Sequence, residues 1–246
     1  LPIYHRPNSL NAGSLWGRPF YILREAWNIL NAIAEGKIES GDEKKLNALK
    51  GETMAVIALC QFDLTRCFGY PYTKDKGASL GAPLIDHLVG TYENPPRSTV
   101  AQAYDFIIET LEEAVTLMSE EKNNGRMNKY AARALLARIY LYHDDNRKAF
   151  DLADQLIKDA DTSGSYALYP HEKYVAAWSV EAKFGSESFF EIANSVDDTP
   201  GRDSWGYLLN WYGYQKGFVT QKYAEQMLAD PGDVRGQDRK STRLNS

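Results

Sequence analysis

The sequence predicts a mainly α-helical fold of tandem, tetratricopeptide-like helix hairpins that carry an irregular, partly extended, loop-rich segment. Apolar residues recur three and four positions apart over most of residues 16–160, which is the period of an amphipathic helix. Short polar turns join several of these segments, and such turns return consecutive helices as antiparallel hairpins. After residue 160 the period is lost, and glycine and aromatic residues become frequent.

Two helices are expected in the first part of the chain, at residues 19–35 and 43–68. Each has one apolar face, and each is followed by residues that end a helix. Gly36 follows the first helix, and Gly69-Tyr70-Pro71 follows the second. Glycine tolerates the conformation that closes a helix, and proline cannot continue one.

Residues 70–98 are expected to be irregular, and three more helices follow them. The expected ranges are 99–121, 129–142 and 147–160, and Ser98 is the expected N-cap of the first of these. A short helix at about 220–228 ends the patterned part of the chain. Two pieces between these helices, 166–169 and 188–192, have the composition of short strands or extended segments.

Cys60 and Cys67 lie seven positions apart in the second expected helix. Two turns at about 1.5 Å per residue separate their Cα atoms by about 10.5 Å, which is too far for a disulfide. Both cysteines are therefore expected to be small apolar residues of the core.

The helices expected at 129–142 and 147–160 have the spacing of a tetratricopeptide repeat. The residues that match are Leu136, Ala137, Tyr140 and Ala149. Arg133 and Ala153 stand where tryptophan and phenylalanine are usual. The pattern predicts a degenerate repeat, with unrelated helical packing as the alternative.

The composition limits the classes of function. A net charge of −5 disfavours a nucleic-acid partner, because phosphate neutralisation needs clustered lysine and arginine. No cofactor or metal is expected, since the four histidines have no ligand spacing with the cysteines and no phosphate-binding glycine loop occurs. Glu187 and Glu191 would lie about 13 Å apart in an extended strand, beyond the separation that a glycosidase needs, and the chain is not expected to be an enzyme.

Six segments occur in an order that matches a known family. These segments are 16–30, 50–71, 97–107, 125–140, 186–192 and 233–235. The most specific is the run that begins Gly125-Arg126-Met127-Asn128-Lys129. Together they resemble the SusD/RagB family of outer-membrane glycan-binding lipoproteins over residues 16–238. Thr53 and Ile57 depart from the family pattern, in which small and basic residues are commoner.

This resemblance implies a partial SusD-like domain at residues 1–238, with helical repeats at about 16–160 and a loop-rich ligand face at about 161–238. It also implies a SusC-type TonB-dependent transporter as partner and a surface position on the outer membrane. No stretch has the roughly 18 apolar residues of a membrane span. The resemblance implies that membrane contact is made only through a lipid anchor, which is missing from this chain. The basic, polar residues 239–246 are expected to be a non-native tail.

The candidate glycan site is an aromatic, glycine-rich segment within the loop-rich part. Tryptophan and tyrosine rings pack against the C–H face of a sugar, while their N–H and O–H groups meet its hydroxyls. The candidates are Trp205, Tyr207, Asn210, Trp211, Tyr212 and Tyr214. Tyr4 and Asn8, before the first helix, are further candidates that the family architecture implies.

Two alternatives remain open from the sequence. The rings of the aromatic segment could instead cover the underside of their own loop as a small core. The chain could also be a tetratricopeptide scaffold that binds peptides in a concave groove, in place of a protein that binds oligosaccharides or polysaccharides and delivers them to a transporter.

Overall fold

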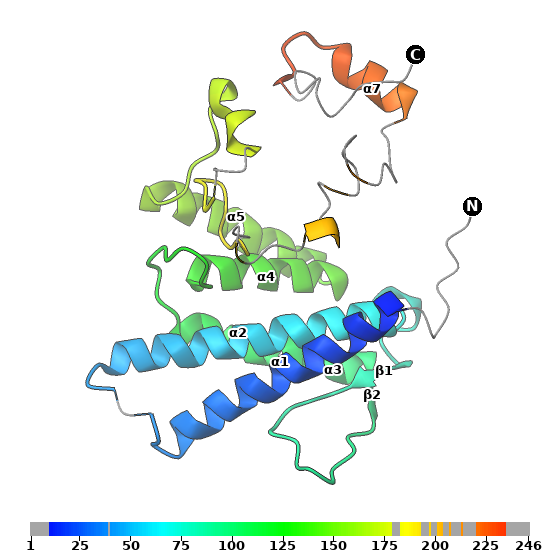
Figure 1. Cartoon of the computed structure of the whole chain (residues 1–246), viewed down its shortest axis with the longest axis vertical. Helices are drawn as coiled ribbons and strands as arrows, with labels where there is room; N and C mark the ends of the chain where they lie inside the picture. The colour runs from blue at the N-terminus through cyan, green and yellow to red at the C-terminus, as the bar shows by residue number, and fades with distance from the viewer. Residues whose placement is uncertain are drawn as a thin grey trace. The chain divides into compact units, whose positions relative to one another are not determined.

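The computed structural model divides the chain into two units, Leu1–Gly164 and Ser165–Ser246. It describes residues 10–38, 40–178, 183–192, 197, 201–203, 207, 213 and 220–234. The described part of the first unit contains five α-helices and a two-stranded sheet (Figure 1). The mainly helical fold class is therefore confirmed.

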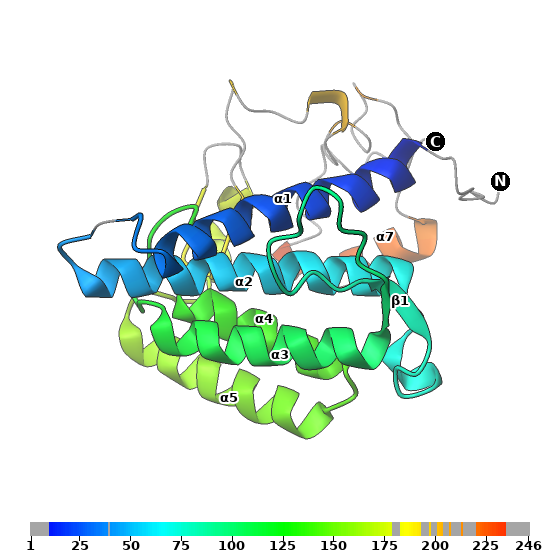
Figure 2. The same ribbon diagram turned by 90° about the horizontal axis from the view of Figure 1, so that it is seen from below.

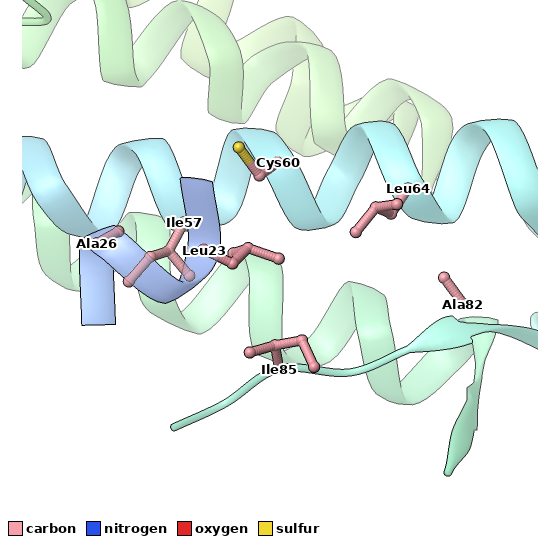
Figure 3. Close-up of a cluster of buried hydrophobic side chains, with 7 residues drawn as sticks. All are labelled: Leu23, Ala26, Ile57, Cys60, Leu64, Ala82 and Ile85. Carbon is pink, nitrogen blue, oxygen red and sulfur yellow. The ribbon is translucent and has the colours of Figure 1, made fainter. Parts of the chain in front are cut away.

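Helices α1 (Leu10–Ala34) and α2 (Glu43–Phe68) form the first hairpin, and a short segment beyond strand β1 (Leu80–Pro83) closes its core. Figure 3 shows the buried cluster, which consists of Leu23, Ala26, Ile57, Cys60, Leu64, Ala82 and Ile85. Trp27 is half-buried beside this cluster and donates its indole N–H to the Ile85 carbonyl at 3.2 Å. The indole therefore has the polar partner that a half-buried tryptophan needs.

Helix α1 begins nine residues before the expected start, and it contains Pro19 instead of beginning there. The extra turns carry Trp16, whose ring packs edge-on against Phe20 at 5.0 Å and Phe68 at 4.8 Å between centroids. The partners of Trp16 lie on two helices, α1 and α2. Their contacts stabilise the turns of α1 that precede Pro19, the residue predicted to begin the helix. Trp16 nevertheless stays 39% exposed.

Helix α2 has the predicted bounds, and Asp42 caps it by accepting hydrogen bonds from the backbone N–H groups of Lys44 and Lys45. Both cysteines are free; Cys60 is buried, and burial raises the pKa of its thiol to about 11. The prediction that Cys67 lies in the core is wrong, because this residue is exposed in the last turn of α2.

The segment at 70–98 is more regular than the sequence predicted. It contains a 3-10 turn at Tyr72–Lys74, and strand β1 pairs antiparallel with β2 (Arg97–Thr99). Strands this short show no alternating apolar pattern, so the sequence did not predict them. A side chain supports their pairing, because Arg97 donates to the carbonyls of Gly81 at 2.6 Å and Leu80 at 3.0 Å. These charge-assisted bonds hold β2 against β1.

Helix α3 (Val100–Leu117) is capped by Thr99 and not by the predicted Ser98, and it ends four residues before the predicted end at 121. Thr99 and Gln102 form a capping box, in which the threonine hydroxyl accepts from the Gln102 backbone N–H at 3.1 Å and the glutamine carbonyl accepts from the Thr99 N–H at 2.9 Å. The Ser98 hydroxyl instead donates to the Ala82 carbonyl at 3.1 Å, so it serves the strand pair.

Helices α4 (Lys129–Tyr142) and α5 (Asn146–Ser163) form the predicted tetratricopeptide-like hairpin. The residues that match the repeat pattern are all buried: Leu136, Ala137, Tyr140 and Ala149. Figure 2 shows α1 to α5 as neighbouring layers of one helical stack. No helix among the described residues is long and apolar enough to cross a membrane.

The described part of the second unit has little regular structure. It contains 3-10 turns at His171–Lys173, Ala176–Trp178 and Gly201–Asp203. It also contains helix α7 (Gln221–Leu228), which Thr220 caps and which lies where the sequence predicted a short helix at about 220–228.

Neither 166–169 nor 188–192 forms a strand. One backbone bond, from the Ala167 N–H to the Ser186 carbonyl at 3.1 Å, joins the two regions, and the rings of Tyr166 and Phe189 pack 4.8 Å apart. Of the two readings that the sequence left open for these pieces, short strands or extended segments, the strand is therefore wrong.

Candidate functional site

Most of the predicted glycan-binding residues lie outside the described residues. These are Trp205, Asn210, Trp211, Tyr212, Tyr214, Tyr4 and Asn8. Tyr207 is described and half-buried. A Cβ at Gly213 would overlap the backbone oxygen of Tyr207, so the backbone at 213 passes directly against the backbone at 207. Only glycine permits so close an approach.

The two glutamates considered as a glycosidase pair hold the backbone of the second unit. Glu187 accepts a hydrogen bond from the Tyr169 N–H at 2.5 Å, and Glu191 accepts one from the Phe184 N–H at 3.0 Å. Phe184 has a positive φ of 53°, a conformation that few non-glycine residues adopt without such support. Both carboxylates thus have structural partners within their own segment.

A surface group of arginine and tyrosine side chains stands out in the first unit. We call Arg66, Arg138 and Tyr142 the guanidinium cluster. Arg66 lies near the end of α2, whereas Arg138 and Tyr142 are one turn apart on α4. Arg66 donates to the Tyr142 hydroxyl at 3.5 Å, and the guanidinium carbons of Arg66 and Arg138 lie 5.5 and 5.9 Å from the centre of the tyrosine ring.

The two guanidinium groups change the acidity of the phenol between them. Hydrogen bonds from Arg66 and Arg138 lower the pKa of Tyr142 below its ordinary value, because both favour the phenolate. Tyr142 is 40% exposed, so the positive potential that acts on its oxygen is present at the protein surface.

Buried rings beneath the cluster fix its position. Phe62 is fully buried and packs edge-on against Tyr142, with 5.4 Å between centroids. Tyr104 lies beside Phe62, and burial raises the pKa of its phenol to about 12. Tyr72 and His143 complete the ring group, 4.2 Å apart. The cluster therefore rests on a packed aromatic base that joins α2, α3 and α4.

Two grooves also open on the first unit. One, of about 420 Å³, lies between α3, α4 and α5, with Leu136 and Leu152 on its floor and Lys148 and Asp151 at its rim. The other, of about 560 Å³, lies beside Glu52, where the loop before α4 meets α2. Both have charges of either sign, and no group of three histidine, cysteine, aspartate or glutamate side chains that could hold a metal ion occurs among the residues that the structure describes.

Sequence reasoning missed the guanidinium cluster. The spacing of Arg138 and Tyr142 on one helix was available as a signal, because residues four apart share a helix face. The third member comes from a position 76 residues away, and only the packing of α4 against α2 brings it to Tyr142.

The comparisons with known proteins agree on one family. Residues 5–141 match a SusD-like family model described as starch-binding and associating with the outer membrane. A search of the curated proteins found no match.

Solved structures give the same result. A candidate sugar-binding protein from Bacteroides vulgatus is 38% identical over 91% of this chain, with a TM-score of 0.82. A SusD superfamily protein from Bacteroides thetaiotaomicron is 34% identical over 89% of the chain, with a TM-score of 0.78. A laminarin-binding SusD-like protein, 23% identical over 79% of this chain and 40% of its own, shares the fold with a TM-score of 0.58. The chain spans about half the length of the first two relatives, 50% and 48%.

Proposed function

The chain belongs to the SusD-like family, and from that premise we propose that its protein binds oligosaccharides or polysaccharides at the cell surface without catalysing a reaction on them. The observation that carries the proposal is the family match over residues 5–141. The structural likeness to the candidate sugar-binding protein of Bacteroides vulgatus supports it.

We place the main sugar contacts in the aromatic segment, at Trp205, Tyr207, Asn210, Trp211, Tyr212 and Tyr214, with Tyr4 and Asn8 as further contacts. Rings on a loop can lie flat against a sugar at little cost in conformational entropy, because tryptophan and tyrosine have few rotatable bonds. The close approach of the backbone at Gly213 and Tyr207 supports this placement, since it brings two parts of the segment together.

The finer part of the proposal concerns the fate of the bound glycan. The protein would be held on the outer membrane by a lipid anchor and would pass its glycan to a SusC-type TonB-dependent transporter. The family description, which names an association with the outer membrane, supports the location. Co-purification of the protein with a transporter expressed beside it would test the partnership, and its absence under mild detergent would contradict it.

Isothermal titration of the chain against a panel of neutral polysaccharides tests glycan binding. We expect modest affinity that improves with oligosaccharide length, because longer chains meet more rings. The double variant Trp211→Ala, Tyr212→Ala should lose roughly tenfold or more in affinity, since stacked rings contribute on the order of 1 kcal/mol each beyond their buried area. Phe150→Ala, which removes a ring that is 64% exposed on α5, is the matched control and should bind as the wild type does.

Three outcomes would contradict the proposal. One is the absence of heat with every glycan, and another is equal loss in the double variant and in Phe150→Ala. The third is binding of peptides by a chain that ignores sugars, which would favour the tetratricopeptide scaffold.

A further inference from the structure

We propose that the guanidinium cluster of Arg66, Arg138 and Tyr142 is an anionic subsite, a place on the first unit where a carboxylate or a sulfate ester of a glycan binds. The inference rests on the proposed function for the presence of a glycan. The anionic chemistry comes from the cluster itself.

The first argument is the balance of charge. Arg66 pairs with Asp63 at 2.8 Å, one turn earlier on α2. Arg138 is exposed and has no carboxylate partner among the described residues, and it interacts with the ring and hydroxyl of Tyr142. The cluster therefore carries one uncompensated positive charge, and an anion would supply the missing partner.

The second argument is the match between donors and ligand. A guanidinium group presents five N–H donors in a planar fork that suits two oxygens of one carboxylate or sulfate. The Tyr142 hydroxyl can accept from only a part of these donors. The remaining N–H groups of Arg138 are available for a charge-assisted, two-point contact, which is stronger than a bond between neutral groups.

The third argument is that the site is held in place before any ligand arrives. Arg138 and Tyr142 lie on adjacent turns of α4, and the buried ring of Phe62 supports the tyrosine from below. Arg66 packs its guanidinium 5.2 Å from the centre of the same Phe62 ring. Binding to side chains that are already ordered costs less entropy. The lowered pKa of Tyr142 agrees with a positive potential at this place.

The surroundings favour an anionic sugar over a longer polyanion. The whole chain has a net charge of −5, so a nucleic acid would meet repulsion beyond the cluster. A single carboxylate or sulfate on a sugar needs only the local charge. Because the site is open to water, its contribution should weaken as salt screens the pair.

Titration calorimetry with three probes tests the subsite in the full chain. The probes are an oligogalacturonate, the same oligosaccharide after reduction of its carboxyl groups, and a sulfated neutral oligosaccharide. We expect Arg138→Gln to weaken binding of at least one anionic probe by about tenfold, the loss expected for one charge-assisted contact. Binding of the reduced probe should not change.

Arg24→Gln is the matched control. It removes the same charge from an exposed position on α1, where Arg24 pairs with the adjacent Glu25 at 2.8 Å. Circular dichroism and the melting temperature of each variant show whether its fold is intact. A smaller effect of Arg138→Gln in high salt would agree with the proposal.

Several results would overturn the subsite. One is an equal loss of affinity in Arg138→Gln and Arg24→Gln. Another is equal binding of the reduced and the carboxylate probes together with no affinity for the sulfated probe. A third is that neither anionic probe binds. If neutral glycans still bind and depend on Trp211 and Tyr212, the subsite fails and the proposed function stands. If no glycan of any kind binds, both fail.

Discussion

Arg133 of α4 and Asp159 of α5 form an ion pair with 2.7 Å between Nη1 and Oδ2, and this pair ties together the two helices of the last hairpin. The Arg133 side chain is only 15% exposed, and Gln155 donates to the other oxygen of the same carboxylate at 2.8 Å. Arg133 stands where a tetratricopeptide repeat usually has tryptophan. A polar bridge between helices therefore takes the place of an aromatic contact.

We predict that Asp159→Asn lowers the stability of the chain at neutral pH and that this effect diminishes in acid. Hydrogen bonds from Gln155 and Arg133 lower the pKa of Asp159 below its ordinary value. A carboxylate with a depressed pKa in the folded state contributes stability above its unfolded pKa, and this contribution is lost as the pH falls through the folded pKa. The difference in melting temperature between the two proteins should begin to shrink below about pH 4 and should go on shrinking as the pH falls to about 3.

Asp151→Asn, which removes an exposed partner of Arg147, is the control and should change the melting temperature little at any pH. A difference between wild type and Asp159→Asn that stays constant down to pH 3 would show that the ion pair is not its source.

The sequence predicted the helices best where caps and breakers surround a strong apolar period. The bounds of α2 and α4 were predicted to the residue, because Asp42 precedes the former and His143-Asp144-Asp145 follows the latter. The start of α1 was missed because a proline looks like a helix start, whereas the ring contacts of Trp16 with Phe68 depend on another helix.

Features that depend on distant partners could not be predicted from spacing. Gln61 is fully buried and bonds to the backbone of Pro83 and Ile85, so a polar side chain in α2 holds the segment after β1. The guanidinium cluster could not be predicted for the same reason, because its members come together only when α4 packs against α2. The aromatic segment at 205–214 was predicted from composition alone, and its role in binding stays a prediction.

We predict that Gly51→Ala destabilises the chain, although alanine is the better helix former. A Cβ at this position would lie 2.9 Å from the backbone oxygen of Ala114 and 2.7 Å from Cγ of Met118. The methionine can move, but the helix backbone of α3 cannot, so the cost of overpacking, about 1–3 kcal/mol, should exceed the gain in helix propensity of about 1 kcal/mol.

Gly17→Ala in α1 provides the comparison, because nothing lies within 4 Å of its hypothetical Cβ. This change should stabilise the chain by about 0.5–1 kcal/mol. Urea denaturation of both variants measures the two effects, and a stabilising Gly51→Ala would disprove the tight contact between α2 and α3.

We predict that Glu52→Gln weakens the junction between α2 and the start of α4. One oxygen of this carboxylate accepts from Nε of Arg126 at 2.9 Å, and the other accepts from the Met127 backbone N–H at 3.0 Å. The Glu52 side chain is 19% exposed, so water replaces these partners poorly. The free energy of unfolding should fall by about 1–3 kcal/mol.

Glu113→Gln is matched to this change, because Glu113 also pairs with a cation, Lys50, at 3.0 Å, but on an exposed surface. Its cost should stay below about 1 kcal/mol. Chemical denaturation measures the free energy of unfolding of the two variants. Equal decreases would mean that the buried position of Glu52 adds nothing to the stability that its contacts confer.

The last prediction concerns the loop between β1 and β2, in which His87 bridges two carboxylates of the same loop. Its Nδ1 lies 2.6 Å from a carboxylate oxygen of Asp86, and its Nε2 lies 2.7 Å from one of Glu93. Hydrogen bonds from His87 to these two carboxylates, Asp86 first, raise the pKa of the imidazole above its ordinary value. Glu93 also accepts from the Gly90 backbone N–H at 3.0 Å, so the charged histidine holds a closed turn.

A raised histidine pKa means that the bridge is complete below the unfolded pKa of about 6.5 and is lost as the pH rises through the folded pKa. Proton NMR of the His87 ring should therefore give a titration midpoint above about 6.5 in the wild type. Glu93→Gln should move this midpoint down toward the ordinary value and speed amide exchange at Gly90, because one of the two carboxylates is gone. An unshifted His87 midpoint in the variant would show that Glu93 does not contribute to the bridge in solution.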